Sequence, residues 1–132
     1  MILVDTSVWI ELLRDRGTRR ASALEIALDG DEPVLTRFQE LELLQGARDE
    51  REWSLLREYL DAQQYLEVGS GSWANAARIF FDLRRRGKTV RSSIDCCVAQ
   101  IAIDHEVLLL HRDRDFETIA EVRPLRQQRL TW

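Results

Sequence analysis

The sequence has little that would tie a small protein together covalently. Its only two cysteines, Cys96 and Cys97, are adjacent, and neighbouring residues on a helix point in different directions, so no disulfide is expected between them. No second cysteine pair is present to complete a structural zinc site. We therefore expect both thiols to be small, buried hydrophobic side chains in a reducing compartment.

Long apolar runs are also missing. A stretch such as 107–110 is too short to cross a bilayer, and residues 1–5 leave no room for a secretory leader before the first acid. The length of 132 residues, with 45% hydrophobic and 32% charged residues, suits one globular domain with its own core. We expect a cytoplasmic protein, with a single domain over residues 1–132 and no membrane contact.

An excess of positive charge is missing as well. The formal net charge of −4 argues mildly against a nucleic-acid partner. However, five acids are singled out below as site candidates, and without them the remaining acids and the bases nearly balance. A basic run from Arg84 to Arg91 is present besides. Net charge therefore decides little about the partner.

Short apolar segments alternate with helical patterns along the chain. Strands are expected at 1–4, 34–36, 65–68 and 107–110, with a last strand at 122–125 or near the end. Helical patterns cover 8–17, 19–28, 37–47, 50–62, about 70–87, 93–104 and 116–121. Short, continuously apolar strands separated by helices are typical of a parallel sheet that is covered on both faces. The predicted fold class is α/β.

Two aspartates follow predicted strands. Asp5 comes directly after the first strand, and Asp113 comes two residues after the strand at 107–110. The carboxyl ends of parallel strands form the edge at which such folds bind ligands, so both side chains are candidates for a site. Asp5 could instead cap the following helix, but Thr6 and Ser7 are available for that task.

Asp95 begins a helical face that is otherwise apolar. Val98, Ala99 and Ala102 share that face, which therefore points toward the core. A buried and unpaired carboxylate is costly, so Asp95 needs a cation. The cation could be a metal ion or the guanidinium of Arg91. Alternatively, Asp95 could be a first-turn aspartate that the helix dipole favours.

Glu42 lies four residues before Gly46 in the helical pattern at 37–47. A glycine inside a helix costs about 1 kcal/mol relative to alanine, so we expect something to approach the helix closely on the side of Glu42. Glu40 is a rival for the same role, and either side chain could be a solvated surface glutamate.

Asp113 and Asp115 form an Asp-x-Asp pair, which can offer oxygens to one hard cation from a turn. Several acids at one sheet edge repel each other unless a divalent metal neutralises them. Carboxylates without histidine or thiolate partners favour Mg²⁺ or Mn²⁺ over zinc. Such a site can activate water for attack on a phosphate.

Four segments in order resemble the signature of a PIN domain, and most closely that of the VapC-type toxins of bacterial toxin–antitoxin pairs. They are MILVDTSVW at 1–9, ELLQGA at 42–47, RSSIDC at 91–96 and HRDRDF at 111–116. Each segment alone is weak evidence for the family, but the four together keep the family's order and spacing over essentially the whole chain. The resemblance implies a PIN-like α/β/α sandwich with a central, mostly parallel sheet, and Mg²⁺- or Mn²⁺-dependent endoribonuclease activity.

The resemblance also implies roles for individual residues. The family's acidic positions are matched by Asp5, Glu42, Asp95 and Asp113. The three aspartates would hold the metal with Asp115 beside them, and Glu42 would ligate the metal or orient the attacking water. Thr6 would orient the site from behind the first acid. The choice of Glu42 over Glu40 rests on its spacing to Gly46.

Partners follow from the resemblance as well. It implies an RNA substrate, a homodimer, and a cognate antitoxin that inserts a segment into the acidic groove, where an arginine would substitute for the metal. From the basic run, Arg85, Arg86 and Arg91 are candidate RNA contacts. The alternative for these arginines is a solvated helix end.

Three other readings of the sequence are weaker. A receiver-type signalling domain needs paired acids after its first strand and a lysine after a late strand, whereas the only lysine here, Lys88, lies in a basic turn. A structure-specific DNA nuclease of related architecture needs further acids and an added helical arch, for which 132 residues leave little space. The complete acidic set argues against a binding module that has lost catalysis.

Overall fold

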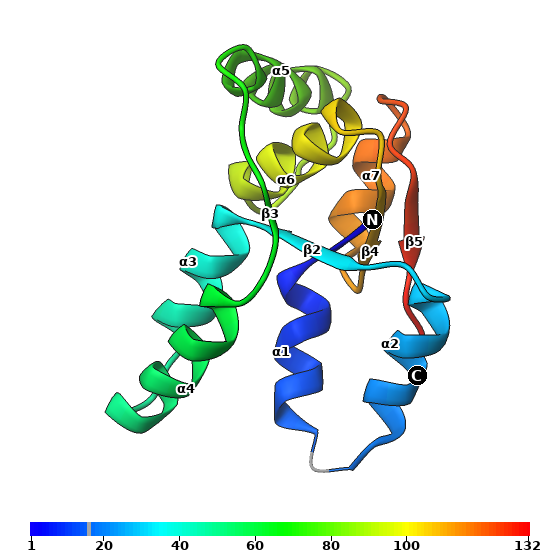
Figure 1. The fold of residues 1–132 in the computed structure, drawn as a ribbon. Coiled ribbons are helices and arrows are strands. Elements are labelled where there is room, and N and C mark those ends of the chain that lie inside the picture. The colour runs from blue at the N-terminus through cyan, green and yellow to red at the C-terminus, as the bar shows by residue number, and fades with distance from the viewer. Residues whose placement is uncertain (16) are drawn as a thin grey trace.

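A computed structural model describes residues 1–15 and 17–132 and shows a parallel sheet between two layers of helices (Figure 1). The elements in chain order are β1 (Ile2–Val4), α1 (Thr6–Arg14), α2 (Arg19–Leu28), β2 (Pro33–Thr36), α3 (Arg37–Gln45), α4 (Glu50–Asp61), β3 (Tyr65–Leu66), α5 (Ser72–Arg85), α6 (Ser93–Asp104), β4 (Leu108–His111), α7 (Arg114–Ala120) and β5 (Gln127–Arg129).

The strand order is β3-β2-β1-β4-β5, and every pairing is parallel. Strand β1 is central, with Ile2 opposite Pro33 on one side and opposite Leu108 on the other. The chain therefore winds outward from β1 in both directions, and the carboxyl ends of β1 and β4 lie at the point where the winding reverses. Open α/β sheets bind their ligands at such points. The mostly parallel sheet expected from the sequence is confirmed.

The two faces of the sheet bury two separate cores. Leu3 and Leu109 pack into the core formed with α5, α6 and α7, whereas Val4 and Leu110 pack into the core formed with α1 to α4. Successive strand side chains point to opposite faces, so continuously apolar strands suit a sheet that is covered on both sides. Figure 1 shows α5, α6 and α7 on one side of the strands and α1 to α4 on the other. The α/β/α sandwich is confirmed.

The element boundaries differ from expectation in several places. Helix α1 ends at Arg14 rather than near residue 17, and β3 has two residues rather than four. Helix α7 begins at Arg114 rather than 116, because the Asp113 carboxylate accepts the Asp115 N–H and caps the helix. Of the two positions considered for the last strand, the one near the end is right, since β5 spans residues 127–129.

The explanation offered for Gly46 is wrong. Helix α3 ends at Gln45, and Gly46 is its C-cap, not an interior residue. A Cβ added at Gly46 would meet the backbone oxygens of Leu43 and Glu42 at 3.6 and 3.7 Å, which are ordinary contact distances. Within the described part of the chain, no atom approaches Gly46 so closely that the position requires a glycine.

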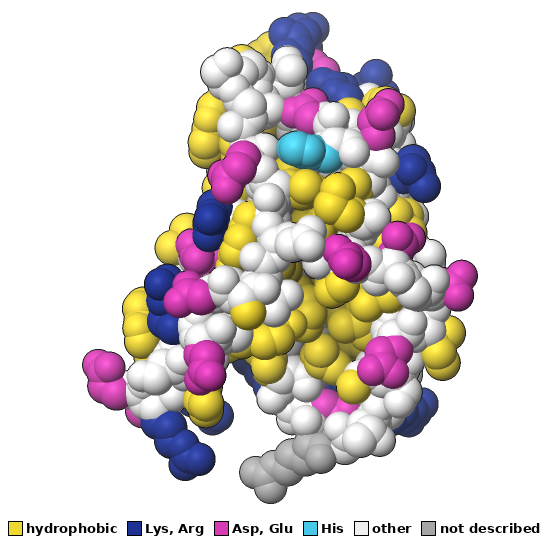
Figure 2. Space-filling model, viewed as in Figure 1, with side chains coloured by type: hydrophobic (Ala, Val, Ile, Leu, Met, Phe, Trp, Pro, Cys, Tyr) yellow, Lys and Arg dark blue, Asp and Glu magenta, His cyan; other side chains and the backbone are white. Residues whose placement is uncertain are grey.

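The surface carries both signs of charge. On the face shown in Figure 2, acidic and basic side chains are interspersed around the edge, and apolar side chains lie toward the middle. Both cysteines are free thiols; Cys96 is buried as expected, whereas Cys97 is only half-buried. Among the helices that the structure describes, none is long and apolar enough to span a bilayer.

Candidate active site

Asp5 lies where β1 passes into α1, and it is the N-cap of that helix. Its Oδ2 accepts the backbone N–H of Ser7 at 3.0 Å and the Ser7 hydroxyl at 2.7 Å. The expectation that Thr6 or Ser7 would take the capping task is therefore wrong. Capping occupies Oδ2, whereas Oδ1 accepts one longer hydrogen bond, from Gln39 Nε2 at 3.3 Å. Asp5 can thus cap the helix and still present an oxygen to the site.

Asp113 occupies the equivalent junction, where β4 passes into α7. Its Oδ1 accepts the Asp115 N–H at 3.0 Å, and its own N–H donates to Nδ1 of His111 at 3.1 Å. The junctions of β1 and β4 are tied together, because the N–H of Arg112 donates to the Ser7 hydroxyl oxygen at 2.9 Å. The two strand ends therefore hold their aspartates in a fixed relation.

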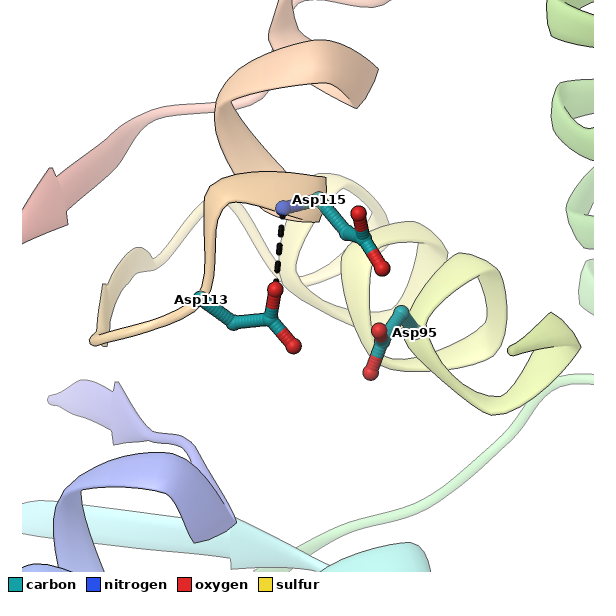
Figure 3. Close-up of side chains that lie close together, drawn as sticks. All are labelled: Asp95, Asp113 and Asp115. Atoms are coloured by element: carbon teal, nitrogen blue, oxygen red, sulfur yellow. Dashed lines mark hydrogen bonds between the residues drawn. The ribbon is translucent and has the colours of Figure 1, made fainter. Parts of the chain in front are cut away.

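Three aspartates meet at this edge of the sheet. Asp95 comes from the first turn of α6, which Ser92 caps, and Asp113 and Asp115 come from the start of α7. One carboxylate oxygen of each lies within 4.8 Å of the others. Figure 3 shows the three carboxylates turned toward one another. We call Asp95, Asp113 and Asp115 the aspartate triad.

Asp5 and Glu42 lie beside the triad, not within it. Asp5 is only 5% exposed, and Glu42, on α3, is half-buried and accepts a hydrogen bond from the Thr6 hydroxyl at 3.3 Å. Glu40 instead forms an ion pair with Arg37. Glu42, not Glu40, therefore lies with the other acids. The spacing to Gly46, which was the argument for preferring Glu42, does not explain this.

The acids repel one another strongly. Burial, followed by the charges of Asp5 and the other neighbouring acids, raises the pKa of Asp95 to about 8. Burial also raises the pKa of Asp5, against the hydrogen bonds from Ser7, which lower it. The pKa of Glu42 is raised by burial and then by the charge of Asp5. The cluster therefore cannot ionise fully at neutral pH without a cation.

Arg91 supplies one cation, but not to the expected partner. Its Nη2 donates to Asp113 Oδ1 at 2.8 Å, and its backbone N–H and Nε donate to Asp115 Oδ2 at 3.0 and 3.3 Å. The alternative of an Arg91–Asp95 ion pair is therefore wrong. These hydrogen bonds, Asp113 first, raise the pKa of Arg91. With 78% of its side chain exposed, Arg91 binds the outer side of the triad.

The remaining triad oxygens fit a hard divalent cation. Within the described part of the chain, neither oxygen of Asp95 accepts a hydrogen bond, and the same holds for Asp113 Oδ2 and Asp115 Oδ1. The neighbouring Cys96 offers no thiolate, because burial raises its pKa to about 12. A donor set of carboxylate oxygens alone suits Mg²⁺ or Mn²⁺.

Two residues that position these acids were missed in the sequence. His111 is fully buried, and since the Asp113 N–H can only donate, Nδ1 accepts and Nε2–H donates to Gln127 Oε1 at 2.7 Å. Gln39 is also fully buried and forms a capping box with Thr36. The Thr-x-x-Gln spacing was the available signal for Gln39. A single histidine after an apolar strand gave no comparable signal.

The remaining candidate residues from the sequence are Thr6, Arg85 and Arg86. Thr6 is buried and donates to Glu42, as a residue that orients the site would. Arg85 and Arg86 lie at the end of α5, where the Arg85 guanidinium stacks 5.6 Å from the ring of Phe81. Their contact with RNA stays a prediction.

Comparison with known proteins adds a family. The PIN domain family model matches residues 2–122. VapC ribonuclease Mb1587 of Mycobacterium bovis and ribonuclease VapC11 of Mycobacterium tuberculosis are each 34% identical over 128 residues, which cover 95% of this chain and 96% of each relative.

Solved structures share the fold. VapBC2 from Rickettsia felis, bound to a DNA fragment from its promoter, superposes with a TM-score of 0.80 at 15% identity, over 99% of this chain and 100% of the other. FitAcB from Neisseria gonorrhoeae superposes with a TM-score of 0.73 at 25% identity, over 92% and 94% of the two chains.

We predict that Asp95→Asn stabilises the metal-free protein at neutral pH. The pKa of Asp95 is about 8 in the folded state and near 3.8 in the unfolded chain, so between these values the folded state holds the extra proton. Stability therefore falls as pH rises through this window, and removing the carboxylate should restore roughly 1–3 kcal/mol at pH 7. Urea unfolding in EDTA across pH 5–9 measures the effect.

The matched control is Asp61→Asn on α4, whose carboxylate is exposed and paired with Arg57. It should leave the pH dependence of unfolding as in the unmodified protein. Equal pH slopes for the unmodified protein and for Asp95→Asn would show that Asp95 is not held with a raised pKa.

We further predict that two substitutions of His111 separate packing from positioning. In His111→Asn the amide oxygen can replace Nδ1 as the acceptor for the backbone N–H of Asp113. In His111→Gln the longer side chain reaches toward Gln127 and leaves the Asp113 N–H without a partner. Both variants should lose stability. Only His111→Gln should weaken Mn²⁺ binding, by about 10–100-fold. Calorimetric titration with Mn²⁺ tests this, and equal affinities for the two variants would contradict it.

Proposed function

The chain belongs to the PIN domain family and, within it, to the VapC proteins, and on this basis we propose that it is a metal-dependent endoribonuclease that acts as the toxin of a toxin–antitoxin pair. The aspartate triad at the winding reversal of the sheet carries the proposal. Relatives named as ribonucleases cover nearly the whole chain, which supports RNA as the substrate.

The residues fit a role in phosphodiester hydrolysis. Asp95, Asp113 and Asp115 would hold Mg²⁺ or Mn²⁺, with Asp5 acting directly or through water. Such an ion lowers the pKa of a bound water and neutralises charge at the attacked phosphate. The observation that supports this donor set is that the facing oxygens of the triad lack hydrogen-bond donors among the described residues.

The surrounding side chains would position the reacting groups. Glu42 lies next to the triad with a raised pKa, which suits a carboxylate that orients the attacking water and accepts its proton. The Thr6 hydroxyl fixes the Glu42 carboxylate from behind. Arg91 holds Asp113 and Asp115 by their outer oxygens and leaves the inner ones free for the ion.

The proposed partners follow from the family. Solved relatives are described as VapBC complexes, so we include a cognate antitoxin, together with a homodimer acting in the cytoplasm. An antitoxin cation that reaches the triad would replace the metal electrostatically. Exposed apolar side chains support a protein partner, because Leu41 and Trp73 line a groove of about 410 Å³ with Phe38 and Val68.

We predict that the purified protein cuts bacterial RNA in Mg²⁺ or Mn²⁺, leaving 5′-phosphate and 3′-hydroxyl ends, and that EDTA stops the reaction. Asp5→Asn should lower the rate by about 10–100-fold. The fold should survive, since asparagine caps helices as well as aspartate does. Gel analysis of the fragments and mapping of their ends measure both expectations.

The control is again Asp61→Asn, which removes an acid outside the site and should cleave like the unmodified protein. Full activity of a folded Asp5→Asn protein would remove Asp5 from the proposed site. Absence of cleavage by folded protein that is free of antitoxin would refute the proposed activity.

A further inference from the structure

A polar cleft adjoins the aspartate triad on its exposed side. It has a volume of about 850 Å³, which is within the range of sites that bind small molecules and large enough for a nucleotide. Its walls come from the turn before α6, the start of α7 and the end of β5. The lining residues are Lys88, Thr89, Arg91, Arg112, Asp113, Arg114, Asp115, Thr118 and Arg129.

The cleft is basic although the whole chain is acidic. Five of its lining side chains are cationic and two are acidic, and the two acids belong to the triad. Among the described residues, none of the side chains that line the cleft is aliphatic or aromatic. A protein segment that docks through apolar residues would find no apolar side chains to pack against here. An anionic ligand that accepts hydrogen bonds would find cations and hydrogen-bond donors.

The five cations are not equally available. Arg112 forms an ion pair with Glu11, donates to the backbone oxygen of Leu130 and stacks on Trp132, so it is held by the protein. Arg91 is bound to the triad.

Arg114 and Arg129 are the least engaged. Arg114 is exposed and forms no ion pair among the described residues. The Nη1 of Arg129 lies 3.6 Å from Glu117 Oε1, which is longer than a hydrogen bond. Both guanidinium groups are therefore free to take a ligand without breaking a strong internal contact.

We propose that this cleft holds the backbone phosphates of single-stranded RNA beside the bond that is cut, with Arg114 and Arg129 as their anchors. The inference rests on the proposed function and adds where the strand lies. Asp113 and Asp115 line both the cleft and the triad, so a strand with its scissile phosphate at the triad continues directly into the cleft. A guanidinium binds phosphate oxygens in a bidentate manner, and the hydroxyl of Thr89 adds a donor.

This placement differs from the one expected from the basic run. Arg85 and Arg86 do not line the cleft, whereas Lys88 and Arg91 from the same run do. Phosphate contacts fix the register of a strand and carry no sequence information. The cleft therefore accounts for affinity toward RNA and not for the choice of the sequence that is cut.

The test uses a double variant, Arg114→Ala with Arg129→Ala. Binding of a fluorescein-labelled single-stranded RNA is followed by anisotropy in EDTA at several salt concentrations. We expect the Kd to rise by about tenfold and the slope of log K against log salt to become shallower by about 0.7 for each lost phosphate contact. With Mg²⁺ present, the KM for cleavage should rise while kcat changes little.

A matched double variant removes the same charge elsewhere. Arg19 on α2 and Arg51 on α4 are exposed, lie outside the cleft and form no ion pair among the described residues. Arg19→Ala with Arg51→Ala should bind and cleave like the unmodified protein. Replacing Arg114 and Arg129 by lysine should keep most of the salt slope, because the phosphate contacts retain their charge.

Two outcomes would overturn the cleft assignment. The first is an equal loss of affinity in both alanine pairs, which would reflect general charge alone. The second is an unchanged KM and salt slope in the cleft pair, above all if Arg85→Ala with Arg86→Ala raises the KM and makes the salt slope shallower instead. Either result can occur while the unmodified protein cleaves RNA. Absence of cleavage by the unmodified protein tests the proposed function separately.

Discussion

Repulsion among buried carboxylates is the constraint on which the rest of this structure depends. The pKa of Asp95 is raised to about 8 because this side chain is buried and because four other acids lie near it. Among the residues that the structure describes, one cation forms hydrogen bonds with the triad, Arg91, and that side chain stays largely in solvent. A fold that maintains this arrangement must stabilise it with strong packing elsewhere. The two apolar cores on either side of the central strands supply that packing.

The acids also take part in folding the chain. Asp5 and Asp113 each follow a strand and cap the next helix, with one oxygen accepting a backbone N–H of that helix. Each therefore satisfies a backbone donor that would otherwise lack a partner, and its second oxygen takes no part in the cap. This double use explains why the junctions between strands and helices carry the aspartates. It also explains why asparagine at these positions should preserve the fold while removing the charge.

Much of the fold and part of the site could be predicted from the sequence. Strand ends locate Asp5 and Asp113, and the apolar face of its helix marks Asp95, because these features depend on local patterns. The prediction preferred Glu42 over Glu40 because of its spacing to Gly46, but no close contact at Gly46 supports that argument. The contacts of His111 with Gln127 and of Gln39 with Asp5 join elements that are distant along the chain. The choice among Asp95, Asp113 and Asp115 as partners of Arg91 depends likewise on the packing of α6 against α7, which no local pattern specifies.

The net charge of the whole chain says little about the partner that we propose, because charge acts locally. At physiological ionic strength, charges in solvent act over roughly 8 Å, so a ligand near the triad responds to the side chains that surround it and not to the total of −4. Five cations line the cleft next to the acids. In the proposed complex with RNA, this positive charge would draw a phosphate chain toward a negative centre that otherwise repels it. An acidic catalytic cluster that acts on a polyanion needs such a neighbour, because a metal ion held by carboxylates leaves little net positive charge to attract the substrate.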